Sequence, residues 1–149
     1  MPDVHVDKMT TAEWELMRII WTLGKAGSRE VIEIIQRKRD WTESTIKTLL
    51  SRLVKKEMLT TTKDGRNFIY HATVPEQTAM NETVDDLFDS LCNMKKGAVI
   101  TELISNLTLT KADIENMQTV LADKLTTAPE MVECDCIPVE GTSCNQCTK

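Results

Sequence analysis

The stretch from residue 42 to residue 70 limits the possible folds most, because a strongly patterned helix is followed there by a hairpin signal. Thr42 is a helix-capping residue type. Apolar residues then recur with the i, i+3, i+4, i+7, i+8 spacing that gives a helix one buried face. They are Ile46, Leu49, Leu50, Leu53 and Val54. The spacing predicts a helix from Thr42 to about Lys56 with a single apolar stripe.

A β-hairpin is predicted directly after this helix. Residues 59–63 and 66–70 are rich in threonine and aromatic side chains, and Asp64-Gly65 separates the two runs. Asp-Gly between two β-prone runs is the strongest short-range signal for a hairpin with a two-residue turn. Lys63 and Arg66 would flank that turn and make the tip of the hairpin basic.

Two more helices are predicted upstream. Thr10 and Glu13 form a capping-box pattern, which opens a helix that ends at Gly24. Ser28 is placed to cap a second helix, which ends near the basic run 37–39. Three helices and a hairpin within about 60 residues describe a winged helix-turn-helix. The predicted fold class is therefore mostly α with a small β-hairpin.

Charge is divided unevenly along the 149 residues, whose formal net charge is −5. Residues 25–73 contain 11 Lys or Arg against 6 Asp or Glu, whereas residues 74–149 contain 5 against 13. This asymmetry indicates that the first part meets a polyanion and that the second part has another role.

The polar face of the predicted 42–56 helix holds hydroxyls and cations and no acid. On it or beside it lie Ser44, Thr45, Lys47, Thr48, Ser51, Arg52 and Lys55. Such a face suits the major groove, where Arg52 and Lys55 would meet phosphates or guanine and the residues nearer the helix start would meet base edges. A solvated helix face would have a similar composition, but the adjacent hairpin favours DNA reading. Lys63 and Arg66 fit phosphate or minor-groove contact, although a charged tip also serves solubility.

Amphipathic helices are predicted from Val74 onward. Their apolar stripes are Val84, Leu87, Phe88 and Leu91; Val99, Ile100, Leu103, Ile104 and Leu107; and Ile114, Met117, Leu121 and Leu125. Three short helices have too little mass for a core of their own, so we expect a second copy of the chain and a two-fold dimer. The expected domains are 1–73 for DNA binding, 74–127 for dimerisation and 128–149 for a cysteine-rich tail.

The tail contains four of the five cysteines, in the pattern Cys-x-Cys, seven residues, Cys-x-x-Cys. No apolar run approaches the roughly 18 residues of a membrane span, so we expect an intracellular protein with reduced thiols. Four thiolates can close a zinc shell, and soft thiolates also select monovalent copper. The predicted ligands of Zn(II) or Cu(I) are Cys134, Cys136, Cys144 and Cys147. A redox pair and two disulfides are the other interpretations. Cys92 stands apart in an apolar helical stripe and is interpreted as a small core residue.

Several segments resemble the penicillinase repressor family, which includes BlaI, MecI and CopY. They are Trp14-Glu-Leu-Met17, Ile20-Trp21, the run 41–56 and the hairpin 64–70. The resemblance covers about residues 8–125. The cysteine-rich tail is similar to the copper-responsive CopY branch. That branch joins two Cys-x-Cys pairs by four residues, whereas this chain has a seven-residue link and a second pair spaced Cys-x-x-Cys.

The resemblance implies a bacterial, cytoplasmic repressor of copper-transport genes and no enzyme. A homodimer would bind a palindromic operator in its zinc form and leave it when Cu(I), delivered by a copper chaperone, takes the thiolates. A thiol redox-responsive repressor is an alternative with the same fold. A copper-buffering or metal-transfer protein is the alternative from a different class.

Overall fold

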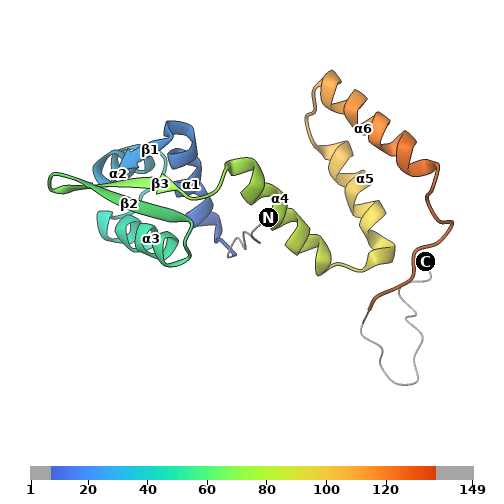
Figure 1. Cartoon of the computed structure of the whole chain (residues 1–149), viewed down its shortest axis with the longest axis horizontal. Helices are drawn as coiled ribbons and strands as arrows, with labels where there is room; N and C mark the ends of the chain where they lie inside the picture. Colours follow the sequence, from blue (N-terminus) through green and yellow to red (C-terminus); the bar gives the residue numbers. More distant parts are fainter. Residues whose placement is uncertain (1–7, 137–149) are drawn as a thin grey trace. The chain divides into compact units, whose positions relative to one another are not determined.

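A computed structural model of the chain describes residues 8–136. The chain divides into two compact units, Met1–Asp86 and Leu87–Lys149. Figure 1 shows the elements of both along the sequence. The longest and most apolar helices among the described residues fall short of what a bilayer span requires.

The first unit combines three helices with a small antiparallel sheet. Its elements are α1 (Thr11–Leu23), β1 (Lys25–Gly27), α2 (Ser28–Gln36), α3 (Glu43–Lys55), β2 (Leu59–Asp64) and β3 (Asn67–Ala72). The strand order is β1-β3-β2, and both strand pairs are antiparallel. In Figure 1 the three helices lie against this sheet, with α3 beside β2. The arrangement is a winged helix, which confirms the predicted fold class.

The core of this unit is built from one face of each helix. Its fully buried side chains include Leu16, Met17 and Ile20 of α1, Val31 and Ile35 of α2, and Ile46, Leu50 and Leu53 of α3. The stripe predicted for α3 is therefore confirmed at Ile46, Leu49, Leu50 and Leu53, while Val54 is half-buried. Burying this stripe fixes which face of α3 meets solvent.

Two predicted helix starts are confirmed and one is wrong. Thr10 and Glu13 form the predicted capping box, and the Thr42 side chain accepts a hydrogen bond from the Thr45 amide. The second helix is capped by Gly27, and Ser28 is its first residue. Gly27 takes the cap position because β1 holds it in an extended conformation opposite Ile69.

The hairpin turn lies one residue later than predicted. Asp64 pairs with Asn67, so the two turn residues are Gly65 and Arg66. Gly65 has φ 65°, which matches a type II′ turn, where glycine takes the first central position. A turn at Asp64-Gly65 of type I′ would require positive φ at Asp64 as well. Arg66 therefore lies within the tip, and Lys63 lies within β2 opposite Phe68.

A buried ion pair ties the start of α1 to the end of α3. The Glu13 carboxylate is 1% exposed and accepts hydrogen bonds from the Thr10 amide at 3.2 Å and from Lys56 Nζ at 2.7 Å. Lys56 Nζ also donates to the Lys8 carbonyl at 2.9 Å. Removing either partner would leave a buried charge or donor without its main partner.

Glu13→Ala is expected to lower the free energy of unfolding by about 2–4 kcal/mol, because it deletes a buried charge partner and half of the capping box. The matched control is Glu15→Ala, which breaks the exposed pair of Glu15 with Arg39. It should cost less than about 1 kcal/mol. Urea denaturation measures both values, and equal losses would contradict a structural role for the Glu13–Lys56 pair.

The second unit holds the later helices. The elements after the sheet are α4 (Glu76–Asp89), whose last residues enter this unit, the 3-10 helix η1 (Asn93–Lys95), α5 (Lys96–Asn106) and α6 (Lys111–Leu125). No side chain described between residues 87 and 136 is buried. Leu87, Leu103, Leu107, Leu121 and Leu125 are 45% to 78% exposed. These helices leave their apolar residues in solvent within one chain.

Candidate nucleic-acid interface and thiol cluster

The outward face of α3 carries every residue that the sequence predicted there. Ser44, Thr45, Lys47, Thr48, Ser51, Arg52 and Lys55 are all exposed. Lys63 and Arg66 of the hairpin are exposed as well. These nine residues are called the α3–wing surface below. They come from α3 and from the β2–β3 hairpin, which is the wing of the winged helix, and both belong to one compact unit.

Local hydrogen bonds order the hydroxyls at the start of α3. The Thr42 and Thr45 hydroxyl oxygens lie 2.9 Å apart, and Thr48 Oγ1 donates to the Ser44 carbonyl at 2.9 Å. A hydroxyl that donates to the backbone keeps its oxygen lone pairs for a further donor. The first two turns thus present fixed acceptors to solvent.

An acid in the first turn of α3 borders the α3–wing surface, which the sequence interpretation of an acid-free face did not take into account. Glu43 in the first turn of α3 lies 2.6 Å from Lys47 Nζ. The hydrogen bond from Lys47 lowers the pKa of Glu43, and the charge of Lys47 acts in the same direction. Lys47 is thereby partly neutralised, so Arg52 and Lys55 are the cations of α3 for which the structure records no ion pair among the described residues.

The wing holds its lysine against an aromatic ring. Lys63 Nζ lies 5.5 Å from the centroid of Phe68, its cross-strand partner. Cation–π contact of this kind contributes about 0.5–1 kcal/mol at exposed sites. It holds the Lys63 side chain over its partner on β3, and Phe68 remains 45% exposed.

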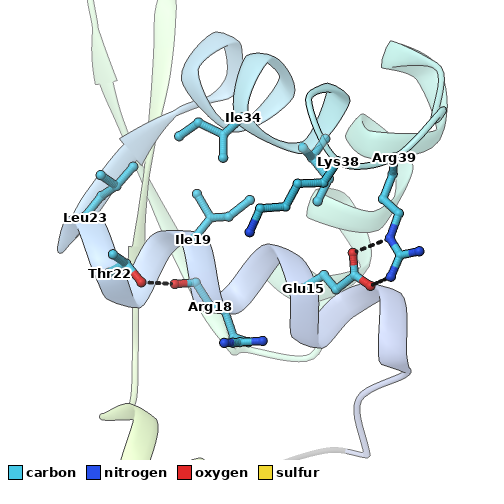
Figure 2. Close-up of a pocket in the computed structure, with 9 residues that line it drawn as sticks. Glu15, Arg18, Ile19, Thr22, Leu23, Ile34, Lys38 and Arg39 are labelled. Atoms are coloured by element: carbon cyan, nitrogen blue, oxygen red, sulfur yellow. Dashed lines mark hydrogen bonds and ion pairs between the residues drawn. The ribbon is translucent and has the colours of Figure 1, made fainter.

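A pocket of about 500 Å³ opens between α1 and α2 (Figure 2). Arg39 points to Glu15 there and donates two hydrogen bonds to its carboxylate, at 3.0 and 2.6 Å. The pKa of Glu15 is lowered chiefly by this hydrogen bond. The one hydroxyl among the lining residues, Thr22 Oγ1, donates to the Arg18 carbonyl at 2.7 Å.

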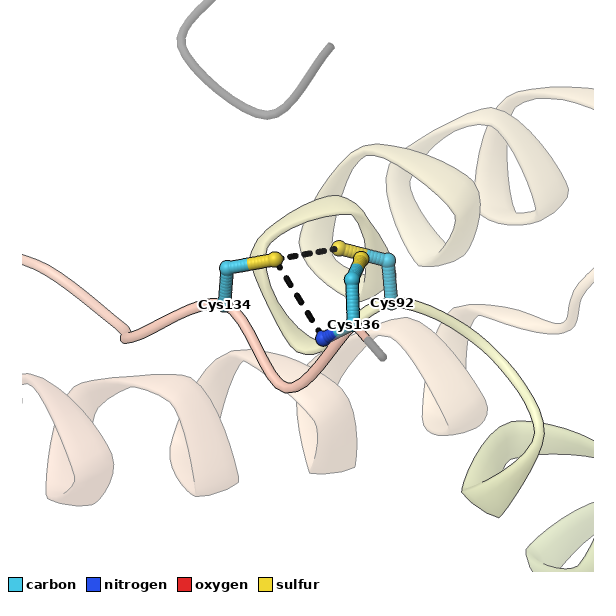
Figure 3. Close-up of side chains that lie close together, drawn as sticks. All are labelled: Cys92, Cys134 and Cys136. Carbon is cyan, nitrogen blue, oxygen red and sulfur yellow. Dashed lines mark hydrogen bonds between the residues drawn. The ribbon is translucent and has the colours of Figure 1, made fainter. Parts of the chain in front are cut away.

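Three thiols meet in the second unit (Figure 3). Cys92, Cys134 and Cys136 present sulfur atoms that all lie within 4.8 Å of one another. Cys92 Sγ and Cys134 Sγ are 4.0 Å apart, too far for a disulfide bond, and the Cys136 amide donates to Cys134 Sγ at 3.4 Å. These three residues are called the thiol cluster below.

The interpretation of Cys92 as a core residue in a helical stripe is wrong. Helix α4 ends at Asp89, and Cys92 lies in the connection before η1, where it is half-buried. The only sequence signal for a role of Cys92 in the cluster was the odd number of cysteines, since one cysteine remains in addition to the four in the tail. Of the predicted ligands, Cys134 and Cys136 belong to the thiol cluster, while Cys144 and Cys147 lie outside the described residues.

The donor set of the thiol cluster fits a soft metal ion. Tetrahedral zinc, with Zn–S of about 2.3 Å, holds its sulfurs about 3.8 Å apart. The Cys92–Cys134 separation of 4.0 Å is close to that value before any metal draws the thiolates together. Soft thiolates also select monovalent copper.

Comparison with known proteins gives the family. Residues 9–123 match the family model described as penicillinase repressor. The chain belongs to the penicillinase repressor family. The repressor is 52% identical over 134 residues to an uncharacterized 16.5 kDa protein of Latilactobacillus sakei, with 90% of this chain and 92% of the relative covered. It is 31% identical to the methicillin resistance regulatory protein MecI of Mammaliicoccus sciuri, covering 78% of this chain and 95% of MecI.

Two repressors are among the solved structures with similarity to the chain. The monomeric form of Bacillus licheniformis BlaI in complex with the blaP half-operator is 34% identical, covers 49% of this chain and 89% of its own, and has a TM-score of 0.45. The CopR repressor is 46% identical, covers 45% and 97%, and has a TM-score of 0.40. By its family the repressor is a transcriptional regulator and not an enzyme.

Proposed function

We propose that the repressor binds palindromic operator DNA as a homodimer and leaves it when Cu(I) occupies thiolates near its C-terminus. The observation that carries the DNA-binding part is the exposed α3–wing surface, rich in hydroxyls and cations, on the winged helix of a repressor family. The proposed domains are residues 1–73 for DNA, 74–127 for dimerisation and 128–149 for metal. The bacterial cytoplasm, where thiols stay reduced, is the proposed compartment.

In the proposed complex, α3 enters the major groove. Its early residues Ser44, Thr45 and Thr48 would face base edges, and Arg52 and Lys55 would meet phosphates or guanine. Lys63 and Arg66 on the wing would contact phosphates of the neighbouring DNA backbone. All of these side chains are exposed on one unit, and burial of the opposite face of α3 supports this orientation.

Dimerisation would cover the exposed leucines of α4, α5 and α6. A two-fold dimer places two copies of α3 on half-sites about one duplex turn, roughly 34 Å, apart. The second unit lacks a buried core among its described residues, which supports a partner chain as its cover.

The thiol cluster supports the metal response. Zinc bound by the tail would favour the operator-bound form, and Cu(I) would favour release. A coupling free energy of about 1–3 kcal/mol is enough to change operator affinity about 5- to 150-fold. A bound metal would supply bonds that fix the tail; the cysteine sulfurs of this chain would hold it as thiolates, and each thiol would release its proton to solvent on binding.

Selection from a random duplex library tests the DNA-binding part. We expect enrichment of a palindrome with half-site centres about one turn apart and a steep loss of affinity with salt. Absence of both enrichment and salt-dependent binding to any duplex would favour the copper-buffering or metal-transfer protein instead.

Mass spectrometry of protein from oxidatively stressed cells separates metal sensing from redox sensing. Metal sensing predicts intact thiols after the metal is stripped. A disulfide between Cys92 and Cys134, whose sulfurs are 4.0 Å apart, would favour the redox-responsive repressor.

Glu43→Gln is expected to tighten duplex binding by about 2- to 5-fold, because it frees Lys47 and removes an acid beside the phosphates. The matched control is Glu33→Gln, which makes the same charge change on α2. Fluorescence anisotropy at fixed salt measures both affinities. An equal gain from both variants would show a general charge effect and contradict a role for the Glu43–Lys47 pair.

A further inference from the structure

We infer that Cys92 is a metal ligand, and that Cys92, Cys134 and Cys136 together form a three-thiolate Cu(I) site that fastens the C-terminal tail to the α4–η1 connection. The inference rests on the proposed copper response and identifies the ligands and the attachment point of that response. It adds a cysteine from outside the tail to the sensor.

The geometry brings together thiols that are 42 residues apart in sequence. The sulfur atoms of all three lie within 4.8 Å of one another, and Figure 3 shows the side chains converging. Cys92 is half-buried and Cys136 is exposed, so the thiol cluster is in contact with solvent. A metal ion placed among three such sulfurs needs only small side-chain shifts to bind them all.

One hydrogen bond holds the tail beside Cys92 independently of the sulfurs, and a second hydrogen bond orders the residue that donates the first. The backbone N–H of Asn93 donates to Asp135 Oδ1 at 2.9 Å, and Lys96 Nζ donates to the Asn93 side-chain oxygen Oδ1 at 2.6 Å. Asp135 lies between the two tail cysteines, and Asn93 follows Cys92 directly. These bonds therefore preorganise the three ligands, which reduces the ordering cost of metal binding.

The number of thiolates favours Cu(I) over zinc at this site. Zinc in structural sites takes four ligands, whereas three soft thiolates satisfy monovalent copper. Each thiol gives its proton to solvent as its sulfur binds the ion. Zinc would therefore need a fourth donor, such as Cys144 or Cys147, and Cu(I) would not. An exchange of zinc for Cu(I) changes how much of the tail is bound.

The position of Cys92 in the chain links metal binding to the helix that leads from the DNA-binding unit. It lies three residues after the end of α4, the helix that continues the chain from the first unit into the second. A metal bond at Cys92 thus ties the tail to the connection after that helix. Metal bound by tail cysteines alone would leave this segment untouched.

The test uses the full-length variant Cys144→Ser/Cys147→Ser, which keeps only the thiol cluster. Cu(I) alone is titrated without oxygen against a chromophoric Cu(I) chelator, and X-ray absorption counts the bound sulfurs. We expect one Cu(I) per chain with three sulfurs. Adding Cys92→Ser should weaken Cu(I) binding at least 10-fold, since it removes one of three ligands, and should reduce the sulfur count to two.

The matched control adds Ser90→Ala to the same background and should leave affinity and sulfur count unchanged. Cys92→Ala serves as a second variant, and circular dichroism checks the helices of each. Unchanged affinity and sulfur count after loss of Cys92 would overturn the inference while leaving a copper-responsive tail intact. Failure of the wild-type chain to compete for Cu(I) would overturn the copper part of the proposed function and the inference with it.

Discussion

Leu103→Asp combined with Leu107→Asp is expected to convert the proposed dimer into monomers and to weaken operator binding by about 100-fold or more. Leu103 lies in the last turn of α5 and Leu107 is its C-cap residue, and they are 45% and 57% exposed in the single chain. Burying four carboxylates in a two-fold interface would be prohibitive, so the interface opens. Each monomer then binds one half-site on its own. The gain in affinity of about 10²- to 10⁴-fold that comes from linking two binding units is lost.

The matched control is Thr101→Asp with Ser105→Asp. It places two acids at the same spacing on the same helix, but at exposed polar positions. Analytical ultracentrifugation gives the oligomeric state, and anisotropy with a full operator gives the affinity. The control should remain dimeric. Dimers of unchanged affinity in the leucine variant would contradict the dimerisation role of α5.

Arg52→Ala combined with Lys55→Ala is expected to abolish tight operator binding, with a loss of at least about 100-fold. A single Arg contact with a base is worth about 1–3 kcal/mol, and the dimer carries each residue twice. If all four side chains contact phosphates, their loss would lower the slope of log affinity against log salt by about 3 to 4. Titrations at several salt concentrations measure both quantities.

A matched control for charge is Arg18→Ala with Lys38→Ala. These residues line the pocket between α1 and α2, so the control removes the same charge away from α3. It should change affinity by less than about 5-fold through the general field of the protein. Similar losses in both double variants would contradict the assignment of the α3–wing surface to DNA.

The sequence was sufficient for features whose signal is local. The i, i+3, i+4, i+7 spacing of Ile46, Leu49, Leu50 and Leu53 required one buried face of α3, and the structure buries all four. The same periodicity predicted which side of α3 would be exposed. The capping box at Thr10 also depends only on residues three apart, and it is formed.

Features that depend on distant partners could not be predicted in the same way. Strand β1 has only three residues, and its extended conformation comes from pairing with β3 more than 40 residues later. That pairing moved the cap of α2 from Ser28 to Gly27. Cys92 was misinterpreted for the same reason, because only the fold of the second unit brings it to Cys134. Local spacing carries no information about such contacts.

The central claim is that metal at the C-terminal thiolates controls operator binding. It is tested most directly by following labelled operator DNA by anisotropy while zinc, and then Cu(I), is added to the repressor. We expect tight binding with zinc and a loss of affinity of about 5- to 150-fold with Cu(I). Cys134→Ser combined with Cys136→Ser should remove this difference, since it deletes two of the three proposed ligands in the thiol cluster. Equal operator affinity of the wild-type protein in both metals would contradict the claim.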